Sequence, residues 1–408
     1  MKDIIPELLS PAGNWACLRA AVQSGADSLY FGIKGINMRH QASNFDVMEL
    51  YKVMEYLHEN GKKGYLTLNT IIMQDELIKV ANILDIAKKA SVDAIILWDF
   101  GVLGLAQERG FRVHLSTQAS VSNISSVKYF SSLGVKRIVL ARECTLEDIK
   151  DIKSEINNQN IDCEIETFIH GAMCVSISGR CFLSSYAHNK SANKGQCLQP
   201  CRREFLIQDI SKEEEFIIGQ DYLLSPKDLC SINFLDKLID GRIDSFKIEG
   251  RMRSAEYVKV VTEVYRNAID LCKSNQFDEN ARSKLSNDLK KVYNRGFSTG
   301  FYFGESKDWQ TKGLGNEYDK IYLGYVSRFF KKISVAEVHL KTRGLELNQE
   351  ILFIGQHTSA QFMIVKEMQI EHESVKKAEK GMIVGIRTPF AVKSKDKIFI
   401  WTPKMKKI

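Results

Sequence analysis

An alternation of short apolar runs with amphipathic segments constrains the fold of this chain more than any other feature. Residues 26–33, 64–70 and 92–99 have the length and composition of buried strands, and residues 48–61 have helical periodicity. The pattern recurs through eight strand–helix steps, the last formed by residues 244–250 and 255–272. Strands that alternate with helices indicate a parallel sheet, and eight such units predict a (β/α)8 TIM-like barrel.

The competing interpretation is an open, doubly wound sheet. A dinucleotide-binding sheet of that kind has a glycine-rich phosphate turn after its first strand, and the first strand here is followed by SPAGNWA. The pattern changes after about residue 316, where short runs with period-2 alternation predict a small antiparallel β-barrel. We therefore expect a barrel domain over residues 1–315, with a cysteine-rich insertion at about 172–232, and a second domain over 316–408.

Polar and charged side chains follow almost every predicted barrel strand. Each of them, taken singly, is more often a loop or capping residue. In a barrel, however, the carboxyl ends of the strands converge on one mouth, where active sites lie. The candidates for a site at this mouth are Asn69, Gln118, Arg142, Glu166, His170, Lys247, Glu249, Arg251 and Arg253.

Five of the nine cysteines fall in the insertion. Cys174 and Cys181 form a C-x6-C pair, Cys197 and Cys201 form a C-x3-C pair, and Cys230 ends SPKDLC. Four thiolates suit either a tetrahedral zinc ion or an iron–sulfur cluster. The spacing is that of neither a zinc ribbon nor a bacterial ferredoxin. Five unrelated buried thiols are the third interpretation, but the surrounding Gly, Ser and Arg are not core composition, so a 4Fe–4S cluster is favoured.

The compartment and the partners are less strongly indicated. No run approaches the roughly 20 apolar residues of a membrane span, and MKDIIPELLSPAG lacks the apolar stretch of a signal peptide. We therefore expect a cytoplasmic protein without a membrane partner. The formal net charge of +7 is compatible with an acidic polymer such as RNA and does not establish one. The sequence leaves the oligomeric state open.

The insertion also carries a family resemblance. The segment ETFIHGAMCVSISGRCFLSS resembles the signature of the U32 peptidase family, also called collagenase-like proteases. The segments NKGQCLQPCRREF, SPKDL, KIEGRMRS and NRGFSTGF extend the similarity over essentially the whole chain. The final strands resemble the family's C-terminal domain, a small barrel like one found in translation elongation factors.

The resemblance implies two kinds of activity. Some family members are called proteases, whereas others take part in oxygen-independent hydroxylation of a wobble uridine in tRNA, a cytidine in large-subunit rRNA, or a ubiquinone precursor. The hydroxylating members are associated with iron–sulfur clusters, and the RNA-modifying ones require prephenate. Carried to this sequence, the resemblance places cluster ligands at Cys174, Cys181, Cys197 and Cys230, with Cys201 as the alternative to one of them. The length and the appended barrel are most similar to the tRNA-type members.

Hydroxylation of tRNA is therefore the favoured function, with formation of 5-hydroxyuridine as the specific expectation. A peptidase is disfavoured because the chain has no GxSxG or HExxH motif. His170 lies four residues before Cys174 and can be written as its base, but a cysteine protease needs one thiol rather than five. Hydroxylation of rRNA cytidine and a non-catalytic factor that uses the cluster as a sensor remain alternatives.

An RNA hydroxylase gives the mouth residues distinct expected roles. Arg142, Lys247, Arg251 and Arg253 are expected to hold prephenate, a similar dicarboxylate or RNA phosphates, unless carboxylates such as Glu249 neutralise them. The side chains of Asn69 and Gln118 are expected to read the edge of the base. The general acid or base is expected at Glu166 or His170.

Overall fold

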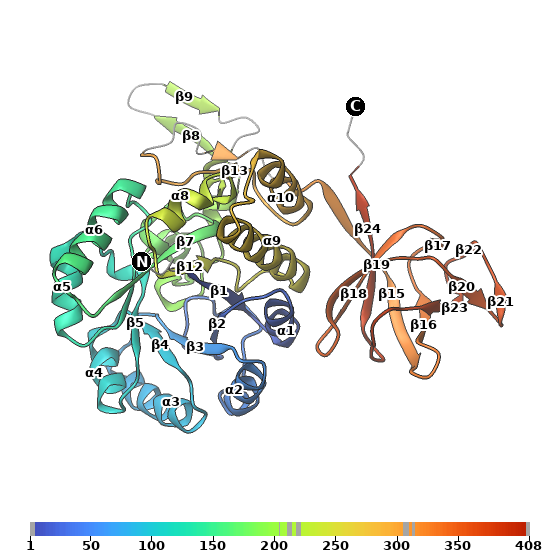
Figure 1. Ribbon diagram of the computed structural model, residues 1–408, viewed down its shortest axis with the longest axis horizontal. Helices are drawn as coiled ribbons and strands as arrows, with labels where there is room; N and C mark the ends of the chain where they lie inside the picture. The colour runs from blue at the N-terminus through green and yellow to red at the C-terminus, as the bar shows by residue number, and fades with distance from the viewer. Residues whose placement is uncertain are drawn as a thin grey trace.

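The protein is represented by a computed structural model that describes residues 5–203, 205–209, 214–217, 222–304, 310–311 and 315–404. Figure 1 shows a ring of strands and helices built from the N-terminal part, with a smaller all-β unit beside it. Residues 405–408 of the expected second domain, and parts of the expected insertion, lie outside the described residues.

The N-terminal part is the predicted parallel barrel. The barrel closes because its last strand pairs with both the first and the seventh, with Ser245 opposite Glu7 on one side and Glu166 on the other. The eight strands are β1 (Glu7–Ala12), β2 (Ser28–Gly32), β3 (Lys63–Leu68), β4 (Ala94–Leu97), β5 (Val113–Leu115), β6 (Arg137–Val139), β7 (Glu164–Gly171) and β12 (Ser245–Ile248). The (β/α)8 prediction is therefore confirmed.

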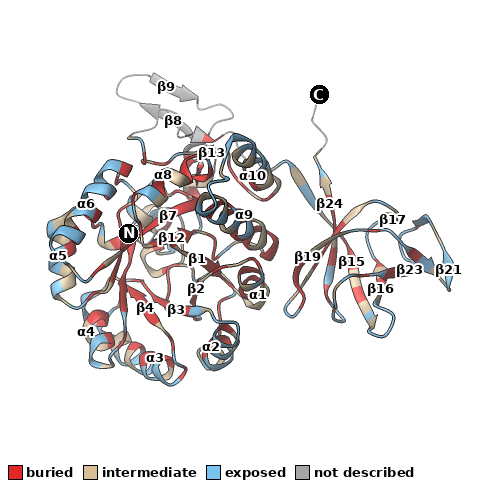
Figure 2. Ribbon diagram, in the orientation of Figure 1, coloured by how far each residue is buried: buried red, intermediate tan, exposed pale blue. Residues whose placement is uncertain are grey.

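Helices surround this barrel and bury their apolar faces against it, as Figure 2 shows by the red inner faces and pale blue outer faces. Asn14 and Asp99 follow barrel strands and accept the backbone N–H of Cys17 and Val102, which starts the next helix. The helices that follow the eight strands include α1 (Trp15–Gln23), α2 (Leu50–Glu59), α3 (Leu77–Lys89), α4 (Phe100–Glu108), α5 (Ile124–Ser132), α6 (Leu146–Asn158) and α9 (Ala255–Lys273).

The cysteine-rich insertion separates β7 from β12. Its last strand runs antiparallel to the end of β7, with Leu229 opposite Gly171 and Cys230 opposite His170. Because the insertion leaves β7 at the strand's carboxyl end, it begins at the mouth of the barrel. Its elements are α7 (Leu183–His188), β8 (Leu206–Asp209), β9 (Glu214–Ile217), β10 (Tyr222–Pro226) and β11 (Asp228–Cys230), and α8 (Leu235–Asp240) leads into β12.

The segment after α9 also packs on the barrel. Helix α10 (Glu279–Lys291) buries Leu285 and Leu289 in the apolar core of the barrel. Strand β13 (Phe297–Ser298) adds to β11, and β14 (Gln310–Thr311) pairs with β10. This segment therefore braces the insertion from outside.

The C-terminal part forms an eight-stranded antiparallel sheet around its own apolar core. The run 361–370, which the alternation predicts as one strand, is divided between two strands at Val365–Glu367. The division arises because the first half pairs with β18 (Glu350–Gly355) and the second with β23 (Ile383–Arg387). The strands of the sheet are β15 (Tyr318–Phe330), β16 (Val335–Leu340), β18 (Glu350–Gly355), β19 (Ser359–Ile364), β20 (Met368–Ile370), β21 (Glu373–Ser374), β23 (Ile383–Arg387) and β24 (Lys397–Pro403), beside a small pair of β17 (Leu345–Glu346) and β22 (Lys377–Ala378).

This sheet is fixed against the helices α1 and α9 of the barrel. Ser359 Oγ donates to the carbonyl of Ala16 at 3.3 Å, and Lys320 pairs with Glu256 of α9. Trp401 is buried in the core that the barrel helices form. Among the described helices, none combines the length and apolar character that a membrane crossing requires.

Candidate functional site

A cavity of about 310 Å³ opens at the carboxyl ends of the barrel strands. Residues from the ends of several strands line it together with the insertion, as expected where parallel strands converge. The predicted mouth residues that line this cavity are Asn69, Gln118, Arg142, Lys247, Glu249, Arg251 and Arg253. Glu166, His170 and Cys230 do not line it.

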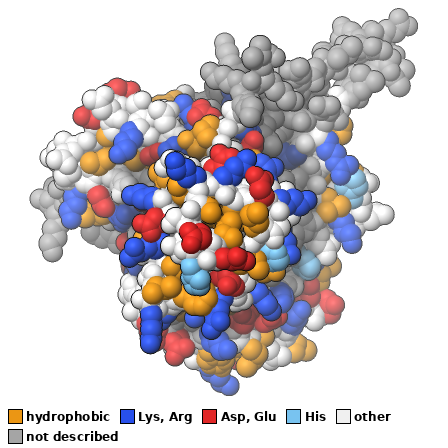
Figure 3. All heavy atoms as spheres, turned by 90° about the vertical axis from the view of Figure 1, so that its right-hand side faces the viewer, with side chains coloured by type: hydrophobic (Ala, Val, Ile, Leu, Met, Phe, Trp, Pro, Cys, Tyr) orange, Lys and Arg blue, Asp and Glu red, His pale blue; other side chains and the backbone are white. Residues whose placement is uncertain are grey.

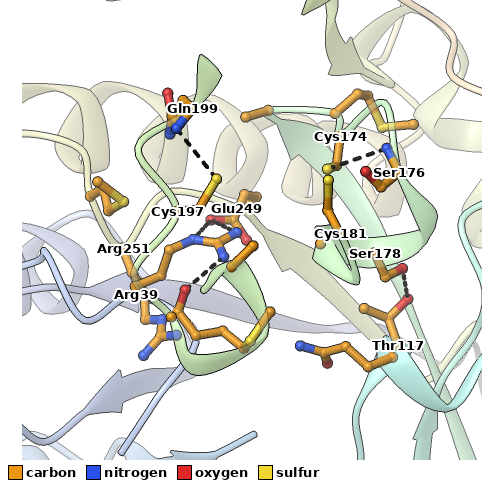
Figure 4. A pocket seen from close by; sticks show the side chains of 18 of the residues that line it. Arg39, Thr117, Cys174, Ser176, Ser178, Cys181, Cys197, Gln199, Glu249 and Arg251 are labelled. Atoms are coloured by element: carbon orange, nitrogen blue, oxygen red, sulfur yellow. Dashed lines mark hydrogen bonds and ion pairs between the residues drawn. The ribbon is translucent and has the colours of Figure 1, made fainter. Parts of the chain in front are cut away.

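Four cysteines of the insertion line the same cavity: Cys174, Cys181, Cys197 and Cys201. Three of these thiols share one local geometry, in which the sulfur accepts the backbone N–H two residues later in the chain. The N···S distances are 3.4 Å for Cys174, 3.3 Å for Cys181 and 3.3 Å for Cys197. Figure 4 shows these three side chains together at the cavity. Backbone N–H donors of this kind stabilise a thiolate, the form that binds metal.

The loop that carries Cys197 is held at the mouth by a close backbone contact. Gly195 has φ +77°, and a Cβ at this position would lie 2.0 Å from the carbonyl oxygen of Asn37. The carbonyl of Gly195 in turn accepts the N–H of His40 at 3.1 Å. Only glycine fits this approach, which joins the insertion to the loop after β2.

The thiols are not packed as a single metal ion would hold them. Within the described part of the chain, no group of three or more His, Cys, Asp or Glu side chains is arranged to hold one ion. Burial raises the pKa of Cys197 and of Cys201, and the backbone N–H of Gln199 acts against this for Cys197. The donor set is nevertheless all sulfur, which suits a soft metal or an iron–sulfur cluster.

Cys230 lies apart from this group. It is buried between β7 and α9, and the hydroxyl of Tyr265 lies 3.8 Å from its sulfur. Burial raises the pKa of this thiol to about 11. Of the two cysteines left as alternatives by the sequence, the structure brings Cys201 to the other three.

The wall of the cavity is strongly basic. Among the described residues, seven arginine and lysine side chains line it, against the single carboxylate of Glu249. Arg39 forms an ion pair with Glu249 at 3.1 Å, which Figure 4 shows beside Cys197. Burial raises the pKa of Glu249, but Arg39, Arg142 and Arg251 outweigh it, so the pKa lies below its usual value. This carboxylate is therefore held ionised among the cations.

Of the three arginines predicted at the strand ends, two, Arg142 and Arg251, have no carboxylate partner among the described residues, whereas Arg253 lies 3.9 Å from Asp228. Arg251 donates to Thr67 Oγ1 at 2.7 Å and to Asn37 Oδ1 at 3.2 Å, and burial lowers its pKa to about 10. Arg142 donates to the carbonyl of Ala172 at 2.9 Å and lies 4.0 Å from the ring centre of Phe168. A buried cation with no ion-pair partner of its own is costly, so these two groups are suited to an anionic ligand.

Lys247 and Glu166 form a buried pair inside the barrel. Lys247 Nζ lies 2.7 Å from Glu166, which also contacts Arg137 at 3.3 Å and accepts from Ser245 Oγ at 3.0 Å. The side chain of Glu166 is 1% exposed. Glu166 thus lies below the cavity and positions Lys247, which reaches the cavity wall.

His170 faces away from the cavity. Its ring lies among aromatic rings outside the barrel, with Nδ1 at 3.3 Å from the hydroxyl of Tyr265. Burial, together with the charge of Arg253, lowers its pKa to about 3, so the ring is neutral. A bulge in β7 explains why the ring of His170 points away from the cavity. Lys247 pairs with Phe168 and the next residue, Ile248, pairs with His170, so Ile169 is the extra residue of the bulge.

The amide side chains expected to read a base are held in place. Gln118 Nε2 lies 3.5 Å from the carbonyl of Asn69, and Ser116 Oγ donates to Gln118 Oε1. Asn69 Oδ1 accepts the N–H of Met38 at 3.3 Å. Both side chains line the cavity.

The sequence reasoning missed Arg39, Arg202 and Arg295, which also line the cavity. Arg202 donates to Ser225 Oγ at 2.6 Å and to the carbonyl of Pro226 at 2.9 Å, so it ties two parts of the insertion together. Arg39 lies in a loop after β2 rather than at a strand end, which is why a search of strand ends does not find it.

Comparisons with known proteins place this architecture in a family. The family model described as peptidase family U32 matches residues 13–312, which is more than half of the chain. The chain belongs to peptidase family U32. An uncharacterized protease of Methanocaldococcus jannaschii is 43% identical over 404 residues, covering 97% of this chain and 98% of that protein.

Members of the U32 family carry names of two kinds. A collagenase of Porphyromonas gingivalis is 38% identical over 402 residues, which covers 96% of this chain and 97% of that protein. A tRNA hydroxylation protein of Bacillus subtilis is 36% identical over 305 residues, which covers 73% of this chain and 71% of that protein. Sequence similarity alone therefore does not distinguish a protease from an RNA-hydroxylation protein, and the residues of the site have to distinguish them.

Proposed function

We propose that this U32 protein is an RNA hydroxylase that binds a 4Fe–4S cluster through Cys174, Cys181, Cys197 and Cys201. The observation that carries the proposal is the gathering of four thiols on one basic cavity at the barrel mouth. A zinc ion would draw four sulfurs to within about 3.8 Å of one another, given Zn–S bonds of about 2.3 Å. A 4Fe–4S cluster binds each thiolate to a separate iron and accommodates a wider spacing.

The proposed substrate is the wobble uridine of tRNA, hydroxylated at carbon 5 without molecular oxygen. The tRNA hydroxylation proteins among the relatives support RNA as the substrate class. The position of His170 speaks against the peptidase alternative, because it faces Tyr265 and does not share the cavity with Cys174. A cysteine protease needs its base within hydrogen-bond reach of the thiol.

Prephenate is the proposed co-substrate. It carries two carboxylates, and two of the guanidinium groups at the barrel strand ends, Arg142 and Arg251, have no carboxylate partner among the described residues. Arginine binds a carboxylate through two parallel hydrogen bonds, which fixes orientation as well as charge.

The remaining residues position the base. Asn69 and Gln118 present amide groups that hydrogen-bond the edge of a uracil, and their backbone contacts fix the direction of those groups. Lys247, oriented by Glu166, places an ammonium group at the cavity wall. When bound, the cluster supplies the redox chemistry that hydroxylation needs.

Anaerobic purification followed by iron and sulfide analysis tests the cofactor. We expect about four irons and four sulfides per chain, and loss of most of both in Cys174→Ala. Cys272→Ala is the matched control, since Cys272 lies on α9 away from the cavity. One zinc per chain, or no metal with all nine thiols free to react, would contradict the proposal.

Nucleoside analysis of tRNA from a deletion strain tests the substrate. We expect 5-hydroxyuridine and its derivatives to disappear and to return with the wild-type gene or the Cys272→Ala gene, but not with Cys174→Ala. An unchanged tRNA profile with loss of a hydroxycytidine from large-subunit rRNA would transfer the activity to rRNA. Unchanged tRNA and rRNA profiles would refute the RNA hydroxylase.

A further inference from the structure

The rim of the cavity carries exposed aromatic side chains. Phe182 and Tyr186, at the start and the middle of α7, are 66% and 87% exposed. The N–H of Tyr186 donates to the carbonyl of Phe182 at 3.0 Å, so the two rings project from one helical turn, with centroids 6.4 Å apart. Aromatic rings are usually buried because of the area they remove from water. Rings this exposed beside a cavity are suited to a ligand.

The pair is fixed to the cavity by the residues between and around it. Leu183 and Ser184 lie between the two aromatic residues in the chain and line the cavity. The N–H of Leu183 donates to the sulfur of Cys181, and Ser184 Oγ accepts the N–H of Leu198 at 3.1 Å. The backbone that carries the aromatic pair is therefore fixed in the same turn as residues that line the cavity.

The chain segment that carries the pair has charged residues of one sign. Residues 172–203 contain five arginines and lysines and no aspartate or glutamate. Arg180 and Lys190, which flank α7, are exposed and form no ion pair with a described carboxylate. Arg180 is held in position by donating to the carbonyl of Gln118 at 3.1 Å. Exposed aromatics interleaved with cations are the pattern that binds single-stranded nucleic acid.

The outward face of the C-terminal sheet differs from this rim. Figure 3 shows acidic, basic and hydrophobic side chains interspersed on the side that this sheet turns outward. The lysine Lys377, for example, pairs with Glu346 and Glu379 at 3.4 Å each. The rim, rather than this face, has the charge of one sign that phosphates prefer.

We propose that Phe182 and Tyr186 form a stacking platform for an unpaired RNA base next to the base that enters the cavity. Arg180 and Lys190 hold the phosphates on either side of that stacked base. The proposal rests on the RNA substrate proposed above and narrows it to single-stranded segments such as loops, since a paired base cannot lie flat on an aromatic ring. The positive charges of Arg180 and Lys190 complement RNA phosphates, and we therefore infer that the ligand is RNA rather than an apolar protein surface.

Fluorescence anisotropy with a labelled single-stranded RNA of about ten nucleotides tests the platform. In anaerobically purified full-length protein, we expect Phe182→Leu/Tyr186→Leu to weaken binding by roughly 5- to 150-fold for each base that loses its stack. Phe182→Tyr/Tyr186→Phe keeps both rings and is expected to bind like the wild type. Tyr129→Leu removes an aromatic that is 58% exposed on α5, away from the cavity, and serves as the control.

Three outcomes would overturn the platform. The first is unchanged affinity in the leucine variant, and the second is an equal loss of affinity for duplex RNA of the same length. The third is a copurifying protein that the leucine variant loses and an Arg180→Glu/Lys190→Glu variant keeps, because the patch is then a protein-docking site that uses the rings and not the cations. Unchanged iron content in the leucine variant shows that it is folded.

Fluorescence anisotropy measures RNA binding and needs no hydroxylation, so this test is separate from the test of the proposed function. If deletion of the gene leaves the tRNA nucleosides unchanged while the protein binds single-stranded RNA with full affinity, hydroxylation of tRNA is refuted and the platform stands. Normal tRNA modification by a leucine variant that also binds normally would refute the platform alone.

Discussion

Replacement of Glu166 by Gln distinguishes a structural from a catalytic role for this carboxylate. Glu166 is fully buried, and its partners are Lys247 at 2.7 Å and Arg137 at 3.3 Å. Arg137 keeps two other carboxylates, Glu7 and Glu164, each at 2.7 Å. Lys247 has no other carboxylate partner among the described residues, so the substitution leaves a buried ammonium uncompensated.

The expected cost follows from that geometry. Removing one partner of a buried ion pair costs about 3–5 kcal/mol, and Glu166→Gln keeps the volume, so no cavity adds to it. Lys247→Met leaves Glu166 with Arg137 at 3.3 Å as its remaining cation and is expected to cost less than Glu166→Gln. The double variant removes both charges and should cost less than the sum of the single variants by about 2–3 kcal/mol.

Urea unfolding of the wild type, the two single variants and the double variant at pH 7, followed by circular dichroism, measures this coupling. Glu263→Gln, which removes an exposed carboxylate of α9, serves as the control. The reasoning fails if Glu166→Gln unfolds at the same urea concentration as the wild type. If that variant is stable and has lost tRNA hydroxylation, Glu166 acts in the reaction instead, either as the acid or base or by positioning Lys247.

Three further outcomes are expected. Cys201→Ala should lower the iron content from about four per chain to less than one, whereas Cys230→Ala should retain it; the reverse result in iron analysis would assign the fourth ligand to Cys230. Arg251→Lys keeps the charge and loses the fork, and calorimetry should show prephenate binding weakened by roughly 10- to 100-fold, with unchanged binding counting against the anion site. Burial raises the pKa of Glu7, but Arg137 outweighs it and holds the pKa at about 2, so Glu7→Gln should cost about 3 kcal/mol at pH 7. Since the depressed pKa stabilises the fold above about pH 4.5 and loses its effect as the pH falls toward 2, unfolding curves of variant and wild type should converge in that range, and a constant difference would refute the assignment.

Much of the site was predictable because two sequence patterns have only a few structural solutions. Eight strand–helix steps close into a barrel, and a barrel brings its strand ends together whatever the loops contain. Asn69, Gln118, Arg142, Lys247, Glu249, Arg251 and Arg253 all line the cavity for that reason. The crowding of cysteines with Gly, Ser and Arg likewise indicated that the insertion is not core.

The orientation of individual side chains was not predictable. Strict alternation from Glu166 through Phe168 would turn His170 into the barrel, but the bulge at Ile169 turns it toward α9. Arg39 reaches the cavity from a loop whose path depends on the contact of Gly195 with Asn37. Both outcomes depend on contacts between segments far apart in the sequence.

The sequence by itself determined the barrel, the antiparallel C-terminal sheet and the position of the cysteine-rich insertion at the mouth. These follow from local periodicity and chain order, which a single sequence displays directly. The tertiary structure decided which cysteines gather, since Cys201 faces the cavity and Cys230 packs against Tyr265. Spacing along the chain cannot distinguish these two thiols, because their directions are set by a loop and by the strand pairing of β11 with β7.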